Sequence, residues 1–287
     1  MKKLFPLFLI IISLMLMLAS CNVESETPGI VYDYSEDGTY ALVIDYTGTA
    51  ARVRIADEYE GLTVKTIYSE AFKNKSITSV IIPDSVTSIG DSAFYNCYSL
   101  TSVTIGNGVT SIGNWAFYYC SSLTSVTIGN GVTSIGDDAF SYCTRLTSVT
   151  IPDSVTIIGS SAFYNCKSLT GVYITDIAAW CDILFINLFA NPSYYAGNLY
   201  LNGELVTELV IPDSVTSIGY MAFYNCDSLT SVTIGKGVTS IGEYSFNACK
   251  SLRSIKYRGT EAEWEGITKG DSWKPYSVTV TYNYDGE

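Results

Sequence analysis

In this chain of 287 residues, some types of side chain that can act in catalysis are frequent and one is absent. The chain contains 28 aspartate and glutamate residues and eight cysteines, but no histidine. The lack of histidine excludes Ser-His-Asp and Cys-His catalysis in their ordinary forms, HExxH zinc sites and histidine pH switches. We therefore expect either carboxylate chemistry or no catalysis.

The carboxylates do not form an obvious catalytic pair. Asp84 and Asp153 occupy the same position of a repeated sequence block, three blocks apart. If the blocks stack at one strand spacing each, the two carboxyls lie roughly 14 Å apart, beyond the ~5–10 Å of paired glycosidase acids. Asp182 and Glu204 lie in an aromatic segment, and their spacing marks no acid-base pair. We therefore assign no catalytic residue, no metal site and no cofactor.

Six of the cysteines recur three residues after a phenylalanine: Cys97, Cys120, Cys143, Cys166, Cys226 and Cys249. In a stack of blocks they form a column with a spacing of roughly 5 Å, which lies within the distance range of disulfides. Their side chains should nevertheless point in parallel, and a column cannot converge tetrahedrally on a metal. Buried thiols are the favoured interpretation, with a disulfide ladder as the alternative.

The element that must position these residues is a block of about 23 residues, marked by Phe94, Phe117, Phe140 and Phe163 and resumed at Phe223 and Phe246. Self-similarity of this length predicts supersecondary units that stack into a continuous core.

One block illustrates the design. Leu100, Val103 and Ile105 should point inward from a strand, while Ser102 and Thr104 point outward. A turn follows, written either as Pro-Asp-Ser or as Gly-Asn-Gly, and glycine there would permit positive φ. A second short extended segment leads to Asp91, Asn114 or Asp137, which can cap a brief helical turn before the buried Ala-Phe pair.

The blocks resemble the BspA-type leucine-rich repeat family of bacteria, whose copies read approximately LxxIxIPxxVxxIxxxAFxxC. The resemblance covers roughly residues 59–257 apart from one interruption. It implies a β-rich leucine-rich repeat solenoid of short parallel strands and short helical turns, capped at both ends. It also implies adhesion, because the family includes bacterial adhesins. The chain departs from the wider leucine-rich repeat class at one position. Where that class has a hydrogen-bonded ladder of asparagine or cysteine, this chain has Ser85, Gly108 and Gly131.

The first residues predict export. Lys2 and Lys3 precede an apolar run from Leu4 to Leu18, too short and interrupted for a comfortable membrane span. Small residues before Cys21 resemble a lipobox, so we expect a lipoprotein signal peptide at 1–20, lipid attachment at Cys21 and a tether at 21–28. This predicts an exported protein anchored at the bacterial cell surface or outer membrane; a soluble secreted protein is the alternative.

The expected domain boundaries follow from which segments contain the 23-residue repeat and which do not. We expect an N-terminal β-hairpin cap at 29–58, repeats at 59–170, an aromatic-rich insertion or variant repeats at 171–208, repeats at 209–258, and a C-terminal variant repeat and cap at 259–287. Trp180 and Trp264 are interpreted as replacements for the phenylalanine of a repeat.

The outward strand positions predict a hydroxyl-lined face. The candidate binding residues are Ser102, Thr104, Ser125, Thr127, Ser148, Thr150, Tyr173, Ser231, Thr233 and Lys256, with Tyr194 and Tyr195 from the aromatic segment expected beside them. Solenoids often bind ligands on such faces, although hydroxyl rows are also simply solubilising.

The net charge of the chain indicates which classes of macromolecule it can bind. The formal charge is −12, and loss of Lys2 and Lys3 leaves 14 basic against 28 acidic side chains, or −14. Such a protein repels phosphate backbones, so nucleic acid is excluded as a partner. We expect a monomeric, non-catalytic binding or adhesion module for a protein or glycan ligand. The alternative is an enzyme or accessory protein for glycan or peptide breakdown.

Overall fold

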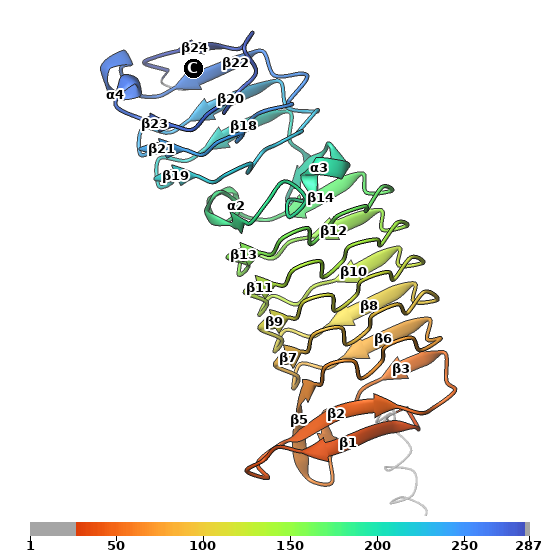
Figure 1. Cartoon of the computed structure of the whole chain (residues 1–287). Helices are drawn as coiled ribbons and strands as arrows, with labels where there is room; N and C mark the ends of the chain where they lie inside the picture. Colours follow the sequence, from red (N-terminus) through yellow and green to blue (C-terminus); the bar gives the residue numbers. More distant parts are fainter. Residues whose placement is uncertain (1–26, 285–287) are drawn as a thin grey trace, which may run out of the picture.

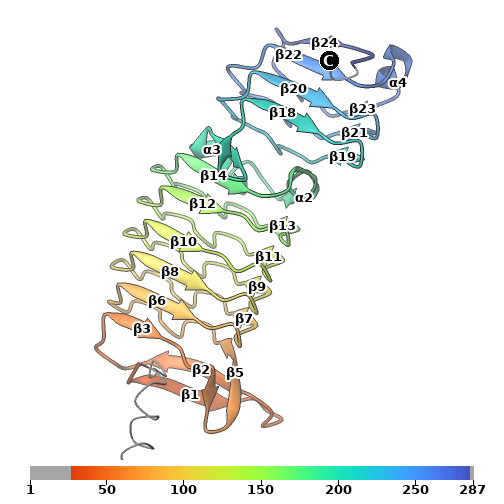
Figure 2. The same cartoon turned by 180° about the vertical axis from the view of Figure 1, so that it is seen from behind.

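The computed structural model describes residues 27–284, and Cys21 with the expected signal peptide lies outside these residues. The chain forms a stack of coils, each with a longer strand, a short strand and a turn segment (Figures 1 and 2). This is the predicted solenoid, with the predicted period. No helix in residues 27–284 has the length and apolar character required to cross a membrane.

One row of strands shares one face of the stack, here called the strand face. They are β3 (Arg52–Arg54), β6 (Ser79–Ile82), β8 (Ser102–Ile105), β10 (Ser125–Thr127), β12 (Ser148–Thr150), β14 (Gly171–Ile174) and β16 (Leu199–Leu201), followed by β18 (Glu208–Ile211), β20 (Ser231–Ile234), β22 (Ser254–Tyr257) and β24 (Thr279–Thr281). Neighbours in this row pair in parallel, except β10 with β12 and β16 with β18, so the face is made of three sheets.

A second row of strands forms the second face, again in parallel. They are β2 (Ala41–Tyr46), β5 (Leu62–Ile67), β7 (Ser88–Ile89), β9 (Ser111–Ile112), β11 (Ser134–Ile135), β13 (Ile157–Ile158) and β15 (Leu184–Phe185), and then β19 (Ser217–Ile218), β21 (Ser240–Ile241) and β23 (Thr268–Lys269). Of these, β2 and β5 have six residues each, and the others have two.

The remaining elements are antiparallel partners and short helices. β1 (Ile30–Tyr34) pairs with β2, β4 (Glu58–Tyr59) with β5, and β17 (Glu204–Leu205) with β16. The helices are α2 (Ile177–Asp182), α3 (Ser193–Ala196) and α4 (Glu261–Glu265).

The turn segments form the third side of the stack, here called the turn flank. Around each repeat phenylalanine, two residues adopt positive φ, as Ser92 (56°) and Asn96 (57°) do around Phe94. This alternation directs every second N–H group toward the next coil, so that the Phe94 N–H donates to the carbonyl of Ala116 at 2.7 Å. Backbone hydrogen bonds therefore join the coils on the turn flank as well as through the strands.

The core is a column of stacked rings between these three sides. Phe72, Phe94, Phe117, Phe140 and Phe163 are fully buried, and their neighbouring ring centroids lie 4.8–5.5 Å apart. The alternation predicted for one block is confirmed, because Leu100, Val103 and Ile105 are at most 2% exposed. Because each coil buries its apolar side chains against the next, the core continues through the stack.

Two details of the coil differ from the sequence-based expectation. Asp91 and Asn114 do not cap their own turns; each accepts a hydrogen bond at 2.7 Å from the backbone N–H of the next coil. Asp84 and Asn107 do the same at the other corner, so an asparagine ladder is present one residue before the position examined in the sequence.

The glycine of the Gly-Asn-Gly turns has a steric role. Gly108 does not adopt positive φ; instead, a Cβ there would lie 1.8 Å from the carbonyl oxygen of Asp84. The close approach of successive coils therefore explains this glycine.

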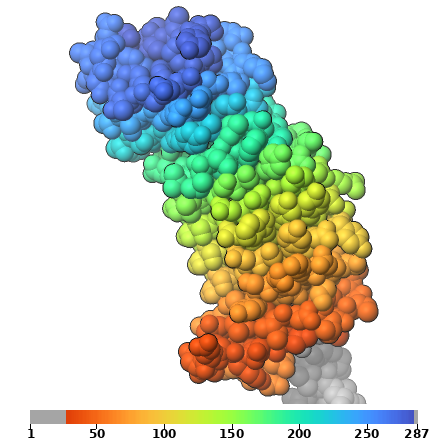
Figure 3. Space-filling view, in the orientation of Figure 1, coloured from red at the N-terminus to blue at the C-terminus, as the bar shows by residue number. Residues whose placement is uncertain are grey.

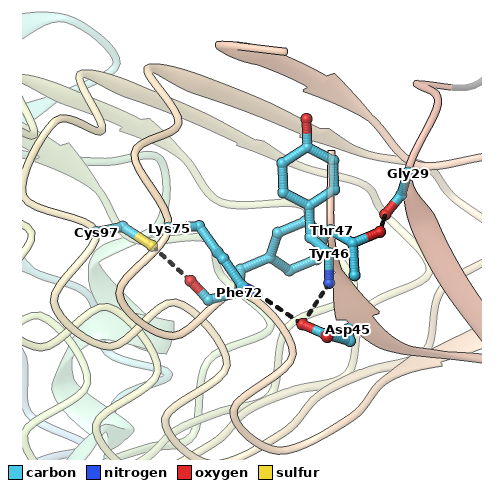
Figure 4. Close-up of polar contacts among 7 residues, drawn as sticks. All are labelled: Gly29, Asp45, Tyr46, Thr47, Phe72, Lys75 and Cys97. Atoms are coloured by element: carbon cyan, nitrogen blue, oxygen red, sulfur yellow. Dashed lines mark hydrogen bonds and ion pairs between the residues drawn. The ribbon is translucent and has the colours of Figure 1, made fainter. Parts of the chain in front are cut away.

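All seven cysteines within residues 27–284 are free and buried. Five of their thiols donate to the carbonyl of a repeat phenylalanine in the preceding coil, as Cys97 does to Phe72 at 3.0 Å (Figure 4). Burial raises the pKa of the Cys97 thiol to about 12. The favoured interpretation of buried thiols agrees with this arrangement, and such thiols are poor nucleophiles.

The N-terminal end of the stack is closed by the hairpin of β1 and β2. Tyr46 of this hairpin packs on Phe72 with ring centroids 5.5 Å apart, which extends the phenylalanine column (Figure 4). Asp45 pairs with Lys75 at 2.8 Å and also accepts from the N–H of Tyr46. At the other end, the ring next to Phe246 is Trp273, so Trp264 packs behind it and outside the column.

The segment 171–208 continues the solenoid as a variant coil with an added hairpin. β14 and β16 extend the strand face, and β15 extends the second face. The strand β17 then turns back, and β18 pairs only with β20. The coils from β18 onward are consequently set off to one side of the earlier ones (Figures 1 and 3).

Candidate binding surfaces

The strand face brings seven of the twelve predicted binding residues together. Ser102 lies opposite Ser125 in the parallel register, and Thr104 opposite Thr127. Thr150 in turn lies opposite Tyr173. A hydrogen bond of 3.3 Å from the N–H of Thr147 to the carbonyl of Thr124 joins β10 to β12. Ser102, Thr104, Ser125, Thr127, Ser148, Thr150 and Tyr173 therefore lie on one continuous surface.

Two adjoining hollows mark the N-terminal part of this face. The first, of about 550 Å³, lies over β3, β6 and β8 and is lined by Arg52, Arg54 and the hydroxyls of Ser79 and Ser102. The second, of about 490 Å³, shares Arg54 and extends over Thr104 and Thr127. The arginines were not among the predicted binding residues, because a two-residue cationic group in a cap carries no sequence signature.

A pair of stacked tyrosines closes the strand face at its other end. The rings of Tyr173 and Tyr200 lie 4.5 Å apart and nearly parallel. Gly171 occupies the position that is Ser148 in the preceding coil. A Cβ at Gly171 would lie 3.0 Å from the ring of Tyr200, so the missing side chain makes room for the pair.

The remaining strand candidates lie apart from this surface. Ser231, Thr233 and Lys256 are on the sheet that begins at β18, beyond the β16–β17 hairpin. Thr233 is only 8% exposed, so the expectation of an open hydroxyl there is wrong. The Lys256 ammonium lies 4.4 Å from the centre of the Tyr284 ring and donates to its hydroxyl.

Tyr194 and Tyr195 belong to the turn flank through their contacts. The Tyr195 hydroxyl accepts a hydrogen bond of 3.0 Å from the backbone N–H of Asn165, an N–H that would otherwise bond to the next coil. Burial raises the pKa of Tyr195. Tyr194 stacks on Tyr224 at 6.0 Å. These residues connect coils and do not extend the hydroxyl face as predicted.

A continuous chain of rings covers the turn flank. We name it the tyrosine ridge; it runs through Tyr95, Tyr118, Tyr119, Tyr142, Tyr164, Phe189, Tyr194 and Tyr224. Successive ring centroids lie 4.5–6.0 Å apart. Most of its rings are half-buried, and Tyr119 is 42% exposed.

The ridge was missed at the sequence level, although a signal was present. A tyrosine occupies one of the two positions after the repeat phenylalanine in several blocks, but the position alternates, as in Tyr118 and Tyr142. Only the ring contact between Tyr119 and Tyr142, at 4.5 Å, shows that the two positions merge into one surface.

The carboxylates considered for catalysis have structural partners or lie exposed. Asp84 accepts from the N–H of Asn107, and Asp153 accepts from the hydroxyl of Thr175. Asp182 ends α2 and Glu204 begins β17, both exposed. Within residues 27–284, no cluster of three or more cysteine, aspartate or glutamate residues could hold a metal ion.

Parallel strands on two faces, a turn flank and an asparagine ladder define a leucine-rich repeat solenoid. The family model described as the BspA type leucine rich repeat region matches residues 65–190 and 197–264, in six copies. The chain therefore belongs to the BspA-type leucine-rich repeat family, as the sequence resemblance predicts.

The chain is also similar to several solved structures. The T. pallidum leucine rich repeat protein TpLRR is 24% identical, with a TM-score of 0.54, over 88% of this chain and 100% of its own. A leucine-rich repeat protein from Bacteroides ovatus is 23% identical, with a TM-score of 0.45, over 92% of this chain and 80% of its own. A leucine rich cell surface protein from Faecalibacterium prausnitzii is 23% identical, with a TM-score of 0.44, over 85% of this chain and 97% of its own. No curated protein sequence matches this chain significantly.

Proposed function

We propose that this protein is an exported, lipid-anchored binding module that holds an extracellular macromolecule against its strand face without transforming it. The observation that carries the proposal is the pair of adjoining hollows over β3, β6, β8 and β10. Binding sites are concave and combine apolar surface with a few polar groups, as these hollows do.

The side chains of the strand face suit a binding role. Serine and threonine lose little conformational entropy when a ligand covers them, and each offers a donor and acceptors. They stand on hydrogen-bonded parallel strands, so their spacing is set before the ligand arrives. Arg52 adds positive charge in the first hollow, which favours an acidic group of the ligand there, whereas Asp57 and Asp84 line the second hollow.

The anchoring part of the proposal rests on the sequence before residue 27. Cys21 precedes the first described residue by only a few positions. An acyl anchor on it would keep the N-terminal end of the stack near the membrane. A Cys21→Ser variant is expected to move from the membrane fraction to the soluble exported fraction. Unchanged membrane association would refute the anchor.

Binding is tested on an array of extracellular matrix proteins and glycans, with Thr104→Trp as the probing variant. Thr104 is exposed and lies in the second hollow, so an indole there should obstruct a ligand without disturbing the core. We expect saturable binding that the variant weakens at least tenfold, about 1.4 kcal/mol. Thr216→Trp is the matched control, because Thr216 is exposed and lies outside both hollows.

The same array is screened for hydrolysis of the bound material. Binding without turnover supports the module, whereas turnover that is lost on replacing Asp182 or Glu204 would show an enzyme. Equal binding by the Thr104→Trp variant and the unsubstituted protein would remove the strand face from the proposal.

A further inference from the structure

The tyrosine ridge is a second surface, separate from the strand face in both position and chemistry. It crosses successive coils and continues through the variant coil by way of Phe189 and Tyr194. At its N-terminal end the ammonium of Lys73 lies 5.5 Å from the centre of the Tyr95 ring. A partly exposed stripe of aromatic rings that crosses this many coils indicates an interaction site.

The ridge repeats with the pitch of the solenoid. The core phenylalanines beneath it are spaced at 4.8–5.5 Å, and most coils contribute one ring or one pair of rings. This pitch is close to the advance of one pyranose unit in an extended glycan. A peptide strand advances by about 3.3 Å per residue and does not match it.

The ridge offers hydroxyl groups as well as rings. The hydroxyls of Tyr95, Tyr118, Tyr119 and Tyr224 make no hydrogen bond to another residue within 27–284. Burial raises the pKa of Tyr118 and Tyr224, so these phenols stay protonated at neutral pH. They can therefore both donate and accept hydrogen bonds at the edge of the ridge.

The charge of the protein restricts the ligand further. The ridge side chains are uncharged, and the whole chain is strongly acidic. Anionic polymers would be repelled by this net charge. Amide side chains flank the rings, as Asn225 does where its Nδ2 donates to the carbonyl of Tyr194 at 3.0 Å. The ridge therefore offers rings, hydroxyls and amides, with Asp138 as a carboxylate beside Tyr118 and Tyr142, and this combination suits a neutral rather than an anionic glycan.

We propose that the tyrosine ridge binds a neutral, extended polysaccharide lying along the axis of the stack. The sugar rings would pack on the outer faces and exposed edges of the aromatic rings, because stacked pairs such as Tyr119 and Tyr142 cover each other's inner faces. The sugar hydroxyls would exchange hydrogen bonds with the phenols. Because each ring is held by its neighbours, little side-chain entropy is lost on binding.

The test uses affinity electrophoresis of the protein in gels containing an extended neutral polysaccharide: mixed-linkage β-glucan, arabinoxylan or galactomannan. The probing variant is the double substitution Tyr119→Asn and Tyr142→Asn. Asparagine already occupies this position in other coils, with φ of 57° at Asn96 and 61° at Asn165, so the backbone tolerates it. We expect at least one polysaccharide to retard the protein, and the variant to bind roughly tenfold more weakly.

Tyr276→Asn is the control, because Tyr276 is 100% exposed and lies outside the ridge. It should bind as the unsubstituted protein does, and so should Thr216→Trp, because Thr216 is exposed and lies outside the ridge and both hollows. Failure to bind any of these polysaccharides would overturn the proposal, as would unchanged binding by the double variant. Binding only to polygalacturonate or to a matrix protein would overturn it as well, while leaving the strand-face proposal intact.

Discussion

In the coils of Phe94, Phe117 and Phe140, backbone groups of one coil bond to backbone groups of the next, whereas in the variant coil side chains take over this role. The N–H of Phe117 donates to the carbonyl of Ala139 at 2.8 Å. The carbonyl of Ala222, at the equivalent place after the variant coil, receives the indole Nε1–H of Trp180 at 2.8 Å. Equivalent carbonyl groups therefore accept from a backbone N–H in the regular coils and from a side chain in the variant coil.

Other side chains of the variant coil act similarly. The Asn191 amide donates to the carbonyl of Met221 at 2.8 Å, and the Ser193 hydroxyl donates to the carbonyl of Tyr224 at 3.0 Å. On the preceding side, Asn187 Oδ1 accepts from the N–H of Ser161. Asn191 and Ser193 are almost fully buried, which is tolerated because their polar atoms are bonded.

This difference in hydrogen-bond donors shows how a solenoid can join two stacks of coils that are offset sideways from each other. In a regular coil, many residue types would satisfy the backbone ladder, because the donors belong to the main chain. In the variant coil, particular side chains must reach particular carbonyls, so the join depends on single residues. This dependence accompanies the sideways offset of the coils from β18 onward (Figure 2).

The largest expected effect is in the regular region. Phe117→Ala removes a fully buried ring that stacks on Phe94 at 5.0 Å and Phe140 at 5.2 Å. We expect the free energy of unfolding to fall by about 3–5 kcal/mol, because a cavity opens in a close-packed column. Urea denaturation followed by fluorescence measures it. A loss below about 1 kcal/mol would contradict a shared core.

An intermediate effect is expected at the join. Trp180→Phe keeps an aromatic ring but removes the donor to Ala222, leaving a buried carbonyl with only the longer 3.3 Å bond from Asn191. The expected loss in free energy of unfolding is about 1–3 kcal/mol. Trp115→Phe is the control, since Trp115 is 42% exposed and should change stability little. Equal stability of both variants would show that the indole hydrogen bond does not matter.

The smallest effect is expected at the N-terminal end, where an ion pair links the cap to the first coil. The hydrogen bond from Lys75 holds the pKa of Asp45 below its ordinary value of 3.8. A lowered folded pKa stabilises the protein above the unfolded pKa, and this stabilisation disappears as the pH falls through the folded value. Both partners are partly exposed, so Lys75→Ala should cost only about 0.5 kcal/mol at neutral pH.

Thermal unfolding of both proteins at pH 7 and again well below pH 4 checks this assignment. The difference in Tm between variant and unsubstituted protein should shrink at the acidic pH, because protonated Asp45 no longer attracts Lys75. A difference that is constant with pH would assign the effect of Lys75 to packing.

The repeat itself made most of the fold predictable. Val103, Ile105 and Phe117 recur at fixed spacing, so their burial follows from one block and extends to the others. The candidate site was predictable only in part. Ser102 and Thr127 lie on the expected face, but the split of the sheet at β17 could not be inferred from strand patterns. Thr233 has the same local sequence as Thr104, yet it is buried.

Local periodicity was therefore sufficient for everything that each coil repeats: its strands, its inward residues and its buried cysteines. Only the assembled structure decided how neighbouring coils combine their unlike residues. Tyr119 and Tyr142 become one ridge, and Trp180 becomes a donor to a residue far along the chain, because coils are brought together across three dimensions. Contacts between coils depend on pairs of residues that no single block contains, whereas burial within a coil depends on a pattern that every block shows.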